Sequence, residues 1–255
     1  MKTAFYKTIC LLLLAFAAVF QTRGEVLPDE TLKYVVSYKW GIIHKDAGTA
    51  RLTVRNHGSD YELTLVGHTL PWADKFYQVR DTLTAVVEKN GFRPKRYVKL
   101  THEKGRYAKD EITYSYAGSA VGGHARKYRV RDGRMEVTEK KLTASGKAFD
   151  MLSVFYYLRL INYSTLQKGQ KFRTTVFSGS KAEQLEIRSL GVEEVKMKDK
   201  SKRKAYHIRF NFTMQGGKKS SDDIDCWISV EKPHIPLLLT GSLPVGQVRC
   251  HYVGS

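Results

Sequence analysis

The amino-acid sequence predicts an all-β protein: a single strongly curved antiparallel sheet or open β-barrel of about 14 strands, with one helix packed against its interior. Three observations predict this fold. Apolar and polar residues alternate over most of the chain after residue 30, turn residues separate the alternating runs, and one segment, residues 150–161, breaks the alternation. Hydrophobic residues make up 42% of the 255 residues. This composition excludes disordered, collagen-like and polytopic membrane proteins.

Residues 1–24 have the pattern of a secretory signal peptide. Lys2 and Lys7 precede the apolar run 8–20, and a polar stretch ends at Gly24. This run is shorter than the about 20 apolar residues that a membrane-spanning helix needs. We therefore expect cleavage near Gly24, export to the periplasm or cell envelope, and a single β-barrel-like domain over residues 25–255 that does not span a membrane.

Alternation with a period of two residues predicts strands that have one face in a core and the other in water. The alternating runs lie near residues 34–40, 50–54, 61–65, 77–85, 112–116, 185–187 and 206–212. Glycine accompanied by Asn, Asp or Ser separates several of them, at Gly58, Gly91, Gly118 and Gly133. These residues accept the backbone angles of tight turns, so the pattern predicts an antiparallel meander.

The segment 150–161 is the predicted helix. Asp150 can accept hydrogen bonds from the first free N–H groups of a helix. The apolar residues that follow fall on every side of the helix, which is typical of a helix enclosed by protein. We therefore expect this helix to pack against the concave face of the sheet.

Two charged residues are predicted to be buried. In the strand that contains Val79 and Leu83, Asp81 lies on the apolar face and Arg80 on the opposite face, while Arg159 belongs to the apolar helix. An isolated buried charge is costly, so each needs a partner or a wet cavity. We therefore expect Asp81 and Arg159 to lie near each other and to pin the helix to the sheet.

This predicted pair has two interpretations. It is a purely structural ion pair, or it belongs to a ligand site in which Arg159 binds an anionic head group beside Asp81. In the second interpretation Tyr156, Tyr157 and Trp72 line an apolar pocket for the rest of the ligand.

The sequence offers little for catalysis, metal binding or redox chemistry. The nucleophile-elbow, zinc-protease, P-loop and dinucleotide-binding motifs are absent, and eight histidines are scattered along the chain. We assign no catalytic residue, metal ligand or cofactor. Asp223 and Asp225 are either part of a turn and strand start or ligands of a hard cation. Cys226 and Cys250 are either one disulfide or two buried thiols.

The chain is strongly basic, with 43 Lys and Arg against 25 Asp and Glu and a formal net charge of +18. Residues 196–204 concentrate six cations around Asp199. This stretch is either a solvated hairpin tip or a finger that contacts phosphate groups or anionic lipids.

Four segments resemble the bacterial domain-of-unknown-function family 3108. They are YKWGIIHKDAGTARL, KFYQVRDTLTAVV, AFDMLSVFYYLRLINYSTLQKGQKF and DCWISVEKPHIPLLLTGSLPVGQVRCHY, in that order over almost all of the chain after the leader. The sequence departs from the family pattern at Cys226 and His234. The resemblance implies an exported envelope protein, as in Bacteroidota, and carries no established activity.

These observations favour an exported, non-enzymatic envelope protein that binds an amphipathic or anionic ligand, such as a lipid or glycolipid, in a barrel-like cavity. The alternative is an interaction or assembly factor whose basic surface docks on an anionic envelope component or an acidic protein partner. A hydrolase would need a nucleophile and a base within hydrogen-bond reach, which sequence alone does not place together. Export argues against nucleic acid as the partner of the basic surface.

Overall fold

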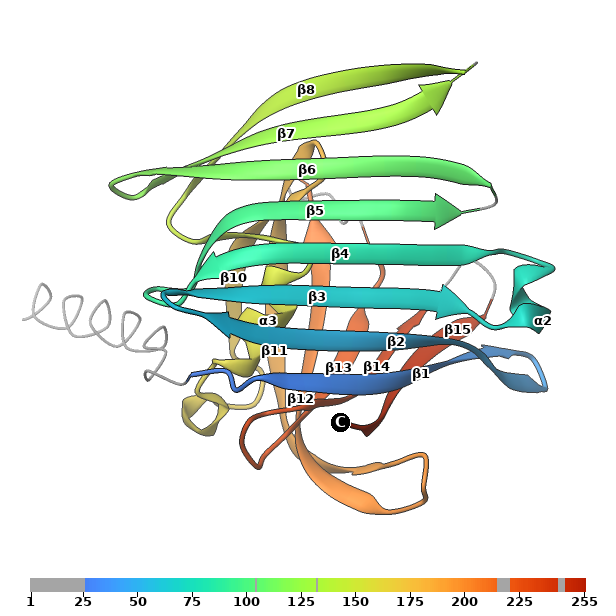
Figure 1. Cartoon of the computed structure of the whole chain (residues 1–255). Helices are drawn as coiled ribbons and strands as arrows, with labels where there is room; N and C mark the ends of the chain where they lie inside the picture. Colours follow the sequence, from blue (N-terminus) through green and yellow to red (C-terminus); the bar gives the residue numbers. More distant parts are fainter. Residues whose placement is uncertain (1–25, 104, 132, 215–220, 243–245) are drawn as a thin grey trace, which may run out of the picture.

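A computed structural model describes residues 26–103, 105–131, 133–214, 221–242 and 246–255, and its strands form one continuous sheet (Figure 1). The predicted signal peptide lies outside the described residues. The strands are β1 (Glu30–Trp40), β2 (Ile43–His57), β3 (Asp60–Thr69), β4 (Val79–Glu88), β5 (Arg93–Glu103), β6 (Arg106–Ala117), β7 (Ala120–Arg131), β8 (Arg134–Ser145), β9 (Ala148–Asp150), β10 (Lys171–Ser178), β11 (Lys181–Lys196), β12 (Lys202–Thr213), β13 (Ile224–Ser229), β14 (Pro236–Ser242) and β15 (Gln247–Gly254). The described residues also form helices α2 (Pro71–Asp74) and α3 (Ser153–Arg159) and the short 3-10 helix η2 (Tyr163–Thr165).

The sheet is built from two meanders. Strands β1 to β8 follow one another, as do β9 to β15, and β15 pairs with β1 to join the two halves into a 15-stranded sheet. The printed pairings are antiparallel apart from that of β9 with β10, which is parallel. The predicted all-β fold with a strongly curved sheet is therefore confirmed.

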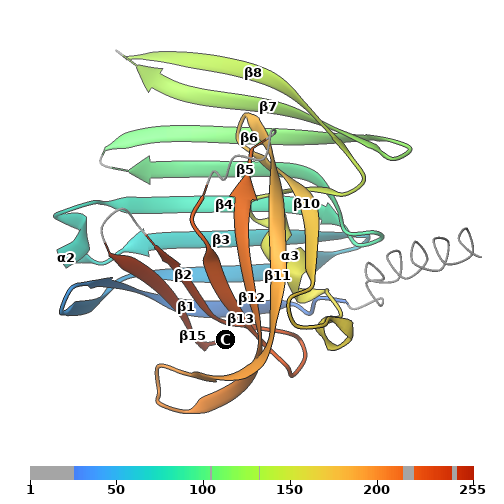
Figure 2. The same ribbon diagram turned by 180° about the vertical axis from the view of Figure 1, so that it is seen from behind.

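The sheet curls until its two ends approach each other. Strands β8 and β9 are its ends, and β9 contacts β5 while β8 contacts β11 (Figures 1 and 2). The backbone of Gly123 in β7 faces Phe177 in β10, and a Cβ atom built on Gly123 would lie 2.7 Å from that ring. Side-chain packing, rather than strand pairing, therefore brings β7 and β10 together across the open side of the barrel.

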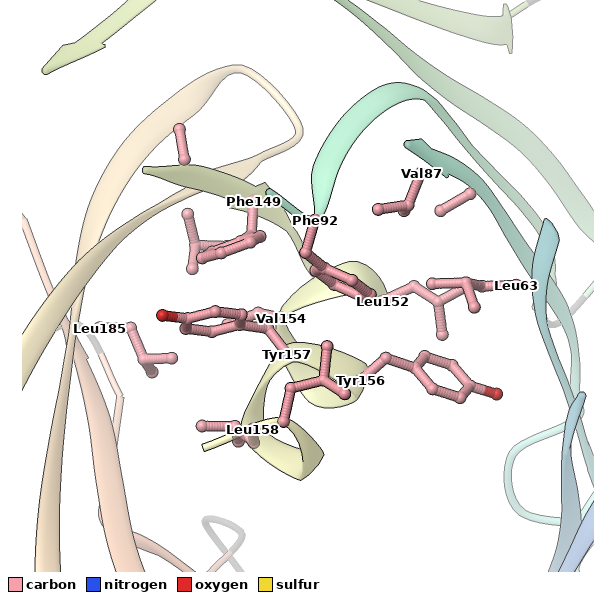
Figure 3. Packing of buried hydrophobic residues seen from close by; sticks show 14 of the residues in the cluster. Leu63, Val87, Phe92, Phe149, Leu152, Val154, Tyr156, Tyr157, Leu158 and Leu185 are labelled. Atoms are coloured by element: carbon pink, nitrogen blue, oxygen red, sulfur yellow. The ribbon is translucent and has the colours of Figure 1, made fainter. Parts of the chain in front are cut away.

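The interior is filled around α3, as Figure 3 shows. Leu63 and Val87 from the first meander and Leu185 from the second point toward the helix. Tyr157 of the helix and Leu152, just before it, are buried between them. The predicted interior helix is confirmed, although it is shorter than residues 150–161.

Asp150 lies in β9, just before the helix, and still performs the predicted capping role. Its Oδ1 accepts the backbone N–H groups of Leu152 at 2.9 Å and Ser153 at 2.8 Å. The Ser153 hydroxyl donates to the other carboxyl oxygen at 2.8 Å. These bonds satisfy N–H groups that the first helical turn leaves free.

A second helix was not predicted. The four-residue helix α2 is too short to change the pattern of apolar residues, and its Pro71 fits the first turn because proline has no N–H to satisfy there. Helices α2 and α3 are short, and within the described chain no helix combines the length and apolarity needed to cross a membrane.

The basic hairpin between β11 and β12 packs against the outer face of the sheet. Val195 and Ala205 form a small second core with Leu237, and Met197 and Trp227 pack against it. Lys198 Nζ lies 2.5 Å from Asp46 Oδ1 in β2. The hairpin is thus held beside the β1–β2 turn, while most of its cations are exposed.

Candidate ligand groove

The groove begins where the side chains on the concave face become small. Leu52 in β2 faces Leu65 in β3, and both pack against the main core. The next pairs along the same face are Ala50 with Gly67 and Gly48 with Thr69. Because side chains alternate between faces, these small residues leave a hollow on the concave face, toward the end that carries α2 (Figure 1).

The resulting groove has a volume of about 680 Å³ and is open to solvent. This volume lies within the range of about 300–1,000 Å³ that is typical of small-molecule sites. Its lining is almost wholly apolar and consists of Val36, Tyr38, Trp40, Ile43, Ala47, Gly48, Thr49, Ala50, Gly67, His68, Thr69, Trp72, Ala73, Phe76, Tyr77, Val79 and Val248. The arrangement can hold an apolar chain or ring, with polar groups left at the opening.

Trp72 forms one wall of the groove and is fixed by two contacts. Its indole N–H donates to the carbonyl oxygen of Asp46 at 2.7 Å, and its ring meets that of Phe76 edge-on with centroids 6.2 Å apart. The ammonium group of Lys45 lies 4.5 Å from the centroid of the Trp72 ring. An apolar wall and a cation therefore meet at this tryptophan.

Helix α2, which carries Trp72, is anchored by Asp74. The Asp74 carboxylate accepts two hydrogen bonds from Arg80, at 2.6 and 3.1 Å, and a further one from the Thr69 hydroxyl. These hydrogen bonds lower the pKa of Asp74, and the one from Arg80 has a larger effect than the one from Thr69. Arg80 points away from the core, as its position in the strand predicts. Its guanidinium group therefore reaches Asp74 of α2.

Asp81 lies on the concave face, as predicted. It pairs in the register with Gly67, a residue that lines the groove. Its Oδ1 is buried and has no hydrogen-bond partner among the described residues. Burial raises the pKa of Asp81, and the Lys99 ammonium opposes this shift.

The predicted pair between Asp81 and Arg159 is wrong, because the ion-pair partner of Arg159 is Glu30. The Arg159 side chain is 1% exposed, and its Nε and Nη2 donate to the carbonyl oxygens of His234 and Pro233, each at 3.1 Å. The alternation of β4 fixes the face on which Asp81 lies but not its distance from the end of α3. The charged groups that act on Asp81 are Lys99 and Glu103.

Tyr156 and Tyr157 are buried in the main core and do not line the groove. The Tyr156 hydroxyl donates to the carbonyl oxygen of Thr53 at 3.1 Å, and the Tyr157 ring stacks on Phe149 with centroids 4.4 Å apart. Figure 3 shows both tyrosines among packed side chains. The structure therefore separates the predicted site residues: Trp72 lines the groove, Asp81 adjoins it, and Arg159 and the two tyrosines belong to the buried helix α3.

Sequence reasoning missed the small residues and the aromatic rim of the groove. The available signal was the run of small side chains at Gly48, Ala50 and Gly67, where same-face neighbours in these strands are leucines. Trp40 and Phe76 gave a weaker indication of a groove in the sequence, because large apolar side chains beside turns also occur in ordinary hairpins.

The other residues singled out in the sequence have structural partners. Cys226 and Cys250 are free thiols, with Leu239 between them in the register, and burial raises the pKa of Cys250 to about 11. Asp225 is bound by Arg209 and His207. The residues that the structure describes contain no group of three or more His, Cys, Asp or Glu placed to hold a metal ion.

Comparisons with known proteins support the fold. One similar solved structure is the crystal structure of a beta-barrel-like protein of domain of unknown function DUF1849 from Brucella abortus. It shares 12% sequence identity, has a TM-score of 0.57, and the match covers 89% of this chain and 98% of that chain. None of the curated proteins compared with the chain matches it. The family model of proteins of unknown function DUF3108 matches residues 33–252, and the chain therefore belongs to the DUF3108 family.

Proposed function

We propose that this protein is an exported, non-enzymatic cell-envelope protein that binds an amphipathic ligand, such as a lipid, in the groove at the α2 end of the barrel. The observation that carries the proposal is an open, almost wholly apolar groove of about 680 Å³ on the concave face, next to leucines that pack against the main core. Burial of an apolar chain in such a groove contributes roughly 25 cal/mol per Å² of apolar surface removed from water. The proposal of export is supported by the leader pattern of residues 1–24.

The polar end of the ligand would lie at the opening. Lys45, above the Trp72 ring, is an exposed cation there and can neutralise a carboxylate or phosphate. Asp81 lies beside Gly67, and its carboxylate would repel a second negative charge nearby. The proposed orientation therefore places the apolar tail along Gly67 and the anionic head group at the mouth.

Gly67→Leu tests this proposal. A Cβ atom at Gly67 would meet nothing closer than a Leu65 methyl carbon at 3.9 Å, so a leucine side chain can extend into the groove without striking backbone. Binding of the fluorescent fatty acid dansyl-undecanoic acid, followed by emission titration, should weaken about tenfold or more, since the side chain occupies space that the probe needs.

Val66→Leu is the matched control. Val66 is the preceding residue of β3 and points to the opposite face, so the added methylene lies outside the groove. We expect the control to bind the probe like the parent protein. Equal binding by the parent, Gly67→Leu and Val66→Leu proteins, or no binding by the parent, would exclude the groove as the site.

A further inference from the structure

Two tips of the chain project at the mouth of the groove (Figure 1). One is the β1–β2 turn, residues Lys39–Lys45 with the sequence KWGIIHK, and the other is the segment after α2, residues Lys75–Gln78 with the sequence KFYQ. Ile42 is fully exposed and Phe76 is 75% exposed. We call these two segments the mouth tips.

The mouth tips continue the apolar wall of the groove to the outside. Trp40, Ile43, Phe76 and Tyr77 line the groove and are also among the exposed large hydrophobic residues of the described chain. Exposed apolar residues that are scattered singly are ordinary, but a group that surrounds the opening of an apolar groove indicates a surface that another apolar phase covers.

The charge of the mouth tips is positive. Lys39, Lys45 and Lys75 are exposed. The acidic residues that adjoin the tips in the sequence are each neutralised by a cation, because Asp46 pairs with Lys198 and Asp74 pairs with Arg80.

The Lys198–Asp46 pair also places the basic β11–β12 hairpin beside the β1–β2 turn. Exposed Lys196 and Lys200 thereby extend the positive surface around the mouth, whereas Lys202 pairs with Glu194 at 3.2 Å. A phospholipid surface of negative charge matches both properties of this region, since it presents phosphate groups above an apolar interior.

We propose that the mouth tips dock on the surface of an anionic phospholipid bilayer, so that the groove opens onto the membrane from which its ligand enters. Ile42 and Phe76 enter the boundary between head groups and acyl chains, and Trp40 and Tyr77 lie at the level of the head groups. The lysines of the tips and of the hairpin contact lipid phosphates. This inference rests on the proposed function, because it assigns the source of the ligand that the groove holds.

Sedimentation with vesicles tests the docking surface. The parent protein, as purified from expressing cells, is mixed with vesicles of phosphatidylglycerol and phosphatidylcholine or of phosphatidylcholine alone. All variants carry the same N-terminus, verified by intact mass, so any contribution of residues 1–25 is common to them. The affinity of the double variant Ile42→Asp with Phe76→Asp for the anionic vesicles should be lower than that of the parent protein by about tenfold or more.

Met135→Asp with Val137→Asp is the matched control, because both residues are exposed apolar positions of β8, at the far end of the sheet order from the joined β1–β15 region. Retained binding by this control, with loss in the mouth-tip variant and weak binding to phosphatidylcholine alone, supports the proposal. Equal binding by both double variants would overturn it, as would equal binding to uncharged vesicles or no binding by the parent protein.

Gly67→Leu distinguishes this inference from the proposed function. The substitution fills the groove and leaves the mouth tips unchanged, so it should weaken probe binding about tenfold or more while vesicle binding remains at the parent level. Probe uptake without any vesicle binding would retain the groove as a ligand site and reject the bilayer as the docking partner.

Discussion

At the scale of single residues, the carboxyl group of Asp150 is the clearest case of a charge whose state depends on burial. It is completely buried, and burial raises the pKa of Asp150 to about 6, although the N–H groups and the hydroxyl that it binds act in the opposite direction. The Asp150 carboxyl group, which caps α3 from β9, is therefore more stable with its proton than without it in mildly acidic solution.

This raised pKa predicts a specific dependence of stability on pH. The stabilising contribution of the proton on Asp150 is fully present below the pKa of the unfolded chain, near 3.8, and is lost as the pH rises through about 6. Asp150→Asn has no such proton to lose. The free energy of unfolding, measured in urea at pH 4 and pH 7, should therefore fall by roughly 2 kcal/mol more for the parent protein than for the variant.

Asp74→Asn is the control of opposite sign. Because Arg80 and Thr69 lower the pKa of Asp74, its contribution is present above the unfolded pKa and is lost as the pH falls through the lowered value. A difference between the parent protein and Asp150→Asn that does not change with pH would contradict the role assigned to Asp150.

At the scale of elements, Arg159 ties the end of α3 to β1 and to the β13–β14 turn. Its guanidinium group binds the Glu30 carboxylate and the carbonyl oxygens of Pro233 and His234, and it lies 5.6 Å from the centroid of the Tyr156 ring. The two charged partners are separated by 129 residues in the chain. This geometry favours the structural interpretation of Arg159.

Arg159→Met should therefore destabilise the fold by about 3–5 kcal/mol, because it leaves the Glu30 carboxylate, whose side chain is only 10% exposed, without its partner. Arg159→Met combined with Glu30→Gln should recover part of this loss. Urea denaturation measures both effects, and dansyl-undecanoic acid binding to the folded variant should be unchanged. Loss of probe binding with unchanged stability would instead make Arg159 a ligand residue.

The sequence pattern was sufficient for much of this element-scale organisation and insufficient for the rest. Alternation in β4 correctly places Arg80 and Asp81 on opposite faces of the sheet. The apolar residues on every side of segment 153–159 correctly predict an interior helix. The partner of Arg159 could not be found, because Glu30 begins β1 before any alternation is visible. Helix α2 could not be found either, because a helix of four residues has no periodicity of its own.

At the scale of the whole molecule, the barrel is completed by packing across its open side. Gly123 in β7 faces the buried ring of Phe177, which also stacks on Tyr114 with centroids 5.6 Å apart. Strands β7 and β10 are not neighbours in the sheet order, so this contact joins the two meanders by packing rather than by strand pairing. Contacts of this kind depend on three-dimensional curvature and have no signal in local sequence patterns.

Gly123→Ala tests this closure. The added methyl carbon would lie 2.7 Å from the Phe177 ring, which has little room to move in the core, and overpacking of this kind costs about 1–3 kcal/mol. Gly67→Ala is the matched control, since its methyl carbon would meet nothing closer than a Leu65 methyl carbon at 3.9 Å. Thermal unfolding should show a lower melting temperature for the first variant than for the second, and equal melting temperatures would argue against closure through Phe177.

The groove is also a property of the whole molecule, because residues from β1 to β4, α2 and β15 line it together. The sequence predicted a binding site inside a barrel and assigned Trp72 to it. It placed the cavity beside Arg159, where the structure has packed side chains. Alternation indicates which face of the sheet a residue lies on, but not how completely the side chains on that face fill the interior.

Native mass spectrometry of the protein purified from expressing cells shows whether the groove holds a ligand. We predict that the parent and Val66→Leu proteins carry a bound amphipathic molecule, which lipid extraction releases and identifies, and that Gly67→Leu does not carry it. A parent protein without any bound molecule, or a Gly67→Leu protein that carries the same molecule in the same amount, would contradict the account.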